Sequence, residues 1–128
     1  MRRILLTAFI LFLSQTSWAE EIDSKYREIL FSYAEAALNE FYYLSSSQKV
    51  PEFSFQEAHF IKGTDRIGRT FFVVMFSEDD GSIFVSLELN KDGLLEVHGR
   101  GGTHVTPKEL ESDFKNQIAH MIHYPGAT

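Results

Sequence analysis

The sequence predicts an α+β fold in which a four-stranded antiparallel sheet packs against a long N-terminal helix and a shorter C-terminal helix. Two observations lead to this fold class. Apolar residues recur at three- and four-residue steps near both ends of the chain, and they alternate or run continuously between residues 53 and 98. Short turn sequences separate the apolar runs in the middle, which favours antiparallel hairpins over parallel crossovers.

Residues 1–19 have the features of a cleavable export signal. An arginine pair follows the first methionine, residues 4–13 are mostly apolar, and small residues occupy positions 17 and 19, the −3 and −1 sites of a cleavage motif. The apolar run is shorter than the roughly 18 to 20 residues that cross a bilayer. We therefore expect cleavage after Ala19 and a bacterial protein that is periplasmic or secreted, with no membrane attachment once cleaved.

The mature chain, residues 20–128, has a length that suits one small α+β domain. It contains 10 basic and 18 acidic residues, because two of the 12 basic residues lie in the signal, so its formal charge is −8. This charge argues against nucleic acid as a partner, since nucleic-acid binding needs a basic surface. The chain has no cysteine, so the apolar core must stabilise the domain without disulfides.

A long amphipathic helix is predicted over residues 21–44. Its apolar side chains recur at three- and four-residue steps, and its charged side chains occupy the other faces. A run of three serines from Ser45 interrupts the pattern, and Pro51 disfavours its continuation. The first helix is therefore expected to end near Leu44.

Four strands are predicted in the middle of the chain. The second contains an uninterrupted apolar run over residues 71–76, and such a run is covered on both faces or at least half-covered on one. The third alternates most regularly, with Ile83, Val85, Leu87 and Leu89 on one face. The predicted strands are residues 53–61, 69–77, 83–89 and 94–98, and the predicted turns are residues 63–68, 79–81 and 90–93.

Residues 98–104 are rich in glycine and are predicted to form a flexible connection. A helix start follows, because Thr106 suits an N-cap, Pro107 the first helical position and Glu109 the third position of a capping box. The resulting order of helix, four strands and helix resembles the cystatin-like layout. The glutamine–valine–glycine hairpin signature of cystatin inhibitors is absent, so the resemblance concerns element order and implies no function.

Four of the five histidines lie in the C-terminal third of the chain. If the glycine-rich connection folded onto the last helix, His98, His104, His120 and His123 could bind zinc or copper through their imidazole nitrogens. No cysteine and no His-Glu-x-x-His pattern accompanies them. We therefore interpret them as scattered surface residues and expect no metal and no cofactor.

No catalytic motif is apparent. The glycines around Arg100 resemble a phosphate-binding loop, but such a loop opens directly onto a helix, and here the predicted helix starts several residues later. The adjacent carboxylates Asp79 and Asp80 are explained by a turn. The sequence therefore predicts a protein that is not an enzyme, with Arg100 on a mobile loop that can contact a partner.

The predicted sheet carries more apolar residues than one helix can cover. Side chains alternate between the two faces of a strand, so these apolar residues are divided between both faces of the sheet. Phe72 and Phe84 are two of them. In the preferred interpretation the second helix covers the remaining face. In the other, part of that face is an exposed contact patch, with Phe72 and Phe84 as anchors and Arg100 at the rim.

These features favour a small exported protein-binding module that docks onto another exported protein, as an inhibitor, immunity or accessory factor does. The alternative is a carrier that holds a small apolar ligand between helix and sheet, with Tyr33 or Tyr43 offering a hydroxyl group.

Overall fold

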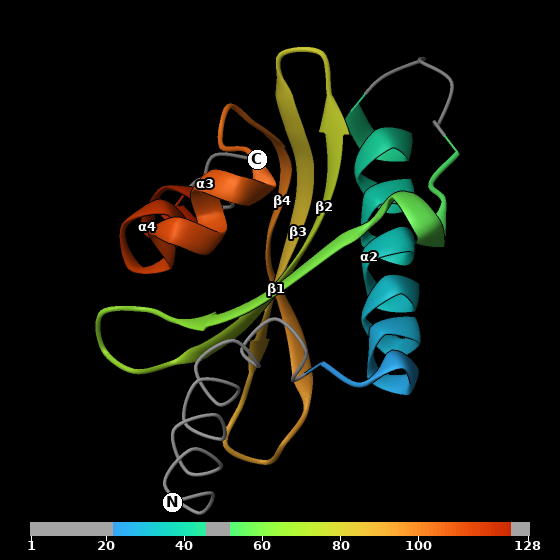
Figure 1. Cartoon of the computed structure of the whole chain (residues 1–128). Coiled ribbons are helices and arrows are strands. Elements are labelled where there is room, and N and C mark those ends of the chain that lie inside the picture. Colours follow the sequence, from blue (N-terminus) through green and yellow to red (C-terminus); the bar gives the residue numbers. More distant parts are fainter. Residues whose placement is uncertain (1–21, 46–51, 124–128) are drawn as a thin grey trace, which may run out of the picture.

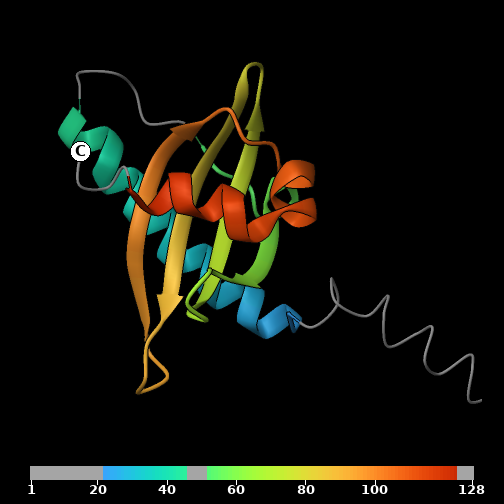
Figure 2. The same cartoon turned by 90° about the vertical axis from the view of Figure 1, so that its left-hand side faces the viewer.

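The computed structural model describes residues 22–45 and 52–123, which form a sheet between two helical layers (Figure 1). The long helix α2 (Ser24–Ser45) covers one face of the sheet, and the shorter helices α3 (Pro107–Ser112) and α4 (Phe114–His123) cover the other. Figure 2 shows α4 crossing the strands on the face opposite α2. The predicted α+β class is confirmed, and the sheet is covered on both faces.

The sheet is an antiparallel meander in the order β1-β2-β3-β4, as predicted. Each strand pairs with its neighbour in the sequence, so β1 and β4 are its two edges. The strands are β1 (His59–Thr64), β2 (Thr70–Glu78), β3 (Gly81–Leu89) and β4 (Leu95–Thr103).

Helix α2 starts at a capping aspartate. Asp23 accepts a hydrogen bond from the backbone N–H of Lys25 at its side chain (3.2 Å) and one from Arg27 at its carbonyl (2.9 Å). The buried face then recurs at four-residue spacing, and Leu30, Ala34 and Leu38 are each fully buried. The apolar spacing that predicted this helix therefore also defines the side that faces the sheet.

Strand β2 is the centre of both cores. Its residues 71–76 are all buried, and they alternate between the two helical layers. Phe72, Val74 and Phe76 pack on the α2 side, whereas Phe71, Val73 and Met75 pack on the α3–α4 side.

The structure corrects the prediction for residues 98–104. These residues do not form a flexible connection, because β4 continues through them to Thr103. Gly99 explains why: a Cβ atom there would lie 2.7 Å from the backbone oxygen of Met121 on α4. The glycine lets α4 approach the strand closely, so it serves packing and not flexibility.

The predicted first strand, residues 53–61, was also wrong in its boundaries. A short 3-10 helix (Phe55–Glu57) precedes β1, and Phe53 and Phe55 pack as rings against Phe76 (4.9 Å between centroids) and Phe31 (5.6 Å). Aromatic residues that looked strand-like therefore anchor the approach to the sheet. The strand itself starts at His59 and extends to Thr64.

The capping box that predicted the last helix is present. The Thr106 hydroxyl accepts from the Glu109 N–H (3.2 Å), and the Glu109 carboxylate accepts from the Thr106 N–H (3.0 Å). The predicted single helix is divided, however, because Asp113 has a non-helical backbone (φ −147°, ψ 59°). The predicted signal, the predicted break beyond Ser45 and the chain after His123 lie outside the described residues.

We expect Gly99→Ala to destabilise the fold by about 1–3 kcal/mol, because the added methyl group would collide with the backbone of α4. Urea unfolding followed by circular dichroism measures the change. Gly102→Ala is the matched control, since Gly102 is exposed on the same strand and no described atom lies within 4 Å of the added Cβ. Equal stabilities of the two variants would contradict the packing role of Gly99.

Candidate functional site

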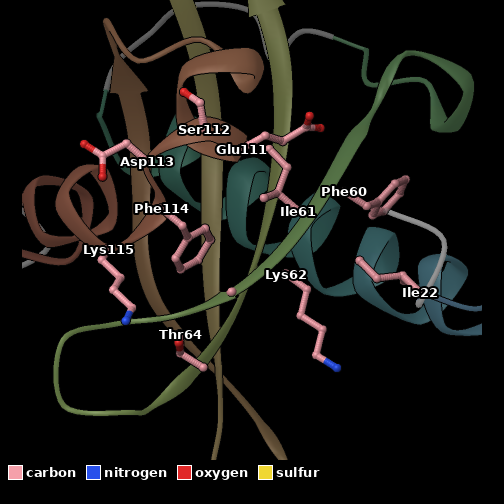
Figure 3. Close-up of a pocket in the computed structure, with 11 residues that line it drawn as sticks. Ile22, Phe60, Ile61, Lys62, Thr64, Glu111, Ser112, Asp113, Phe114 and Lys115 are labelled. Carbon is pink, nitrogen blue, oxygen red and sulfur yellow. The ribbon is translucent and has the colours of Figure 1, made fainter. Parts of the chain in front are cut away.

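A groove of about 570 Å³ runs along β1, the edge of the sheet (Figure 3). One wall comes from the α2 side of the sheet, where Phe60 and Ile22 lie. The other comes from the junction of α3 and α4, where Phe114 stands over the strand. The groove is lined by Ile22, the β1 residues 60–64, and residues 111–115.

The backbone of β1 presents hydrogen-bonding groups to this groove. The backbone N–H of Asp65 donates a hydrogen bond to the carbonyl of Arg69 (3.0 Å). Hydrogen-bonded pairs alternate along an antiparallel ladder, so residues 59, 61 and 63 of β1 bond inward to β2. The two-residue turn between Glu78 and Gly81 leads to the same assignment from the β3 side of β2: the residues of β2 that bond to β3 alternate with those that bond to β1. By this alternation the N–H and C=O groups of residues 60, 62 and 64 point away from β2, toward the groove.

Side chains of β1 alternate between the two walls. Phe60 lies on the α2 side, where its ring approaches that of Phe55 (5.6 Å), and Lys62 lies there with its Nζ 5.9 Å from the centroid of Phe72. Ile61 lies on the α3–α4 side. The floor of the groove is therefore apolar, and its rim carries Lys62 and Lys115 together with Glu111 and Asp113.

Gly63 sets how close the α3–α4 wall comes to the strand. A Cβ atom on Gly63 would lie 2.5 Å from Cγ of Phe114, so any side chain there would displace the ring. Phe114 is the first residue of α4, immediately after the break at Asp113. The break and the glycine together place an aromatic ring directly over the edge strand.

The turn that follows β1 is fixed by a buried carboxylate. Asp65 accepts hydrogen bonds from the backbone N–H groups of Ile67 (3.1 Å) and Arg69 (2.8 Å) and from Nε of Arg69 (2.7 Å). Arg66 on the same turn hydrogen-bonds Asn116 of α4. The end of the groove at Thr64 is thus held to both β2 and α4.

The environment of Asp65 lowers the pKa of its carboxyl group. Burial by itself would raise this pKa, but the hydrogen bonds from Arg69 and Ile67 and the charge of Arg69 outweigh it. The ionised form is therefore the one that the folded state stabilises.

None of the three predicted partner-binding residues lines this groove. Phe72 is 5% exposed in the α2 layer and Phe84 is 3% exposed in the α3–α4 layer, so the second interpretation, in which they anchor an exposed contact patch, is wrong. The second helical layer covers the face that would have displayed them. Arg100 crosses to α2, where it donates to the carbonyl of Ala37 (3.2 Å) and pairs with Glu40 (3.2 Å).

The histidines considered as metal ligands do not form a cluster among the described residues. His98 is the extra residue of a β-bulge and its Nε2 lies 2.6 Å from a Glu88 oxygen, whereas Nδ1 of His104 lies 3.2 Å from the carbonyl of Asp80. His120 is exposed on α4, and the side chain of His123 lies outside the described residues. In the part of the chain that the structure describes, no three His, Cys, Asp or Glu side chains could hold a metal ion together.

Sequence reasoning missed the groove because it placed β1 too early and ended it at Ile61. One residue of the sequence indicates a close contact at this edge. An isolated glycine inside a strand marks a position that other atoms approach closely, and Gly63 is such a residue. That the approaching atoms belong to Phe114, 51 positions later in the chain, could not be read from the sequence.

Comparisons of the chain with protein-family models, with curated proteins and with solved structures found no match. None of the described helices is long and apolar enough to cross a membrane. We therefore infer a function from the geometry of the groove.

We expect Asp65→Asn to lower the free energy of unfolding by about 1–3 kcal/mol at pH 7, since it weakens charge-assisted hydrogen bonds. A carboxyl group whose pKa is lowered by folding stabilises fully above the usual Asp pKa of about 3.9 and loses this effect as the pH falls through its folded pKa. The difference between wild type and variant should therefore shrink below about pH 4.

Urea unfolding at pH 7 and at pH 2.5 (roughly one unit below the usual pKa) measures this change. Asp92→Asn, in the exposed turn between β3 and β4, is the control. If Asp65→Asn lowered the free energy of unfolding by the same amount at both pH values, the assigned role of the carboxylate would be contradicted.

Proposed function

We propose that this chain is an exported, non-enzymatic binding protein that docks an extended segment of another exported protein along the edge of β1. The partner segment would add a strand to the sheet and lie in the groove between Phe60 and Phe114. Such a protein would act on its partner as an inhibitor, an immunity factor or an accessory factor does.

The observation that carries the proposal is the combination of an outward-facing strand backbone with two walls. Strand addition derives its affinity from main-chain hydrogen bonds, and here Phe60 and Thr64 supply outward N–H and C=O groups. Its specificity comes from pockets for alternate side chains, and here Phe60 and Phe114 stand on opposite sides of the strand. An exposed edge strand without such walls would instead favour non-specific pairing with other chains.

The length of β1 suits an occupant of modest size. Its six residues accommodate an added strand of about 20 Å, at roughly 3.4 Å per residue. A linear segment of a folded protein or a flexible tail reaches this length. We therefore favour a short linear element of the partner over a broad folded surface.

The carrier alternative has less support. The layer between α2 and the sheet is filled by buried side chains, including Leu30, Leu38 and Val74, each with no exposed surface. The two tyrosines proposed to offer hydroxyl groups, Tyr33 and Tyr43, are exposed on α2. The groove along β1 lies outside this layer.

The export part of the proposal predicts cleavage after Ala19 when the full chain is produced in a bacterial host. The intact mass and the N-terminal sequence of the protein from the periplasmic or culture fraction measure this. Retention of an uncleaved chain in the cytoplasm would contradict export.

The docking part predicts that Thr64→Pro abolishes capture of the partner. Proline removes the outward N–H of residue 64 and leaves the inward bonds of β1 to β2 in place. Thr64→Ala is the matched control, because it keeps the N–H and should weaken capture several-fold at most.

The measurement is an affinity purification of the tagged, exported protein from its own cell envelope, with circular dichroism to verify that both variants fold. The expected result is one protein retained by wild type and Thr64→Ala and lost from Thr64→Pro. Identical captured proteins for both variants would show that the edge is not the docking site.

A further inference from the structure

We draw no further inference here: the strongest candidate, the pocket at the β2–β3 turn that is lined by Glu78, Asp79, Asp80 and Ser82, is an acidic cluster whose unpartnered Ser82 hydroxyl is enclosed by the described residues, so nothing in the structure shows which ligand it would take.

Discussion

The structure depends on burying β2 on both of its faces. Six consecutive apolar side chains, residues 71–76, cannot be covered by one helical layer, because they alternate between two faces. Helix α2 covers one set, and α3 and α4 must cover the other. Full burial of a large apolar side chain contributes about 1.5–3 kcal/mol, so these six residues supply much of the driving force for assembling three layers.

Covering both faces leaves the edges as the places where the sheet remains accessible. At β4, Gly99 brings α4 close to the strand, and Arg100 links that strand to the carbonyl of Ala37 and to Glu40 on α2. At β1, the chain turns away after Thr64, and Phe114 reaches over Gly63. The two edges therefore differ: β4 is connected to the long helix, whereas β1 borders the groove.

This division relates the fold to the proposed function. The aromatic residues that first suggested a contact surface, Phe72 and Phe84, are used to hold the layers together. In the proposed function, recognition depends on backbone groups of β1 and on a few side chains that line the groove. A binding protein built in this way reads the shape and charge of a linear segment, and its core can remain unchanged when the partner is bound.

The sequence by itself determined the fold class, the long helix, the order of the strands and the capping box at Thr106, because each depends on local periodicity or on residues within one turn. It also identified the apolar run of β2, which it expected to be covered on both faces or at least half-covered on one. Only the tertiary structure decided that residues 98–103 belong to a strand, that Asp113 divides the last helix, and that a groove lies along β1. The strand and the groove depend on contacts between residues distant in the chain, Gly99 with Met121 and Gly63 with Phe114, and local patterns do not identify the partners in such contacts.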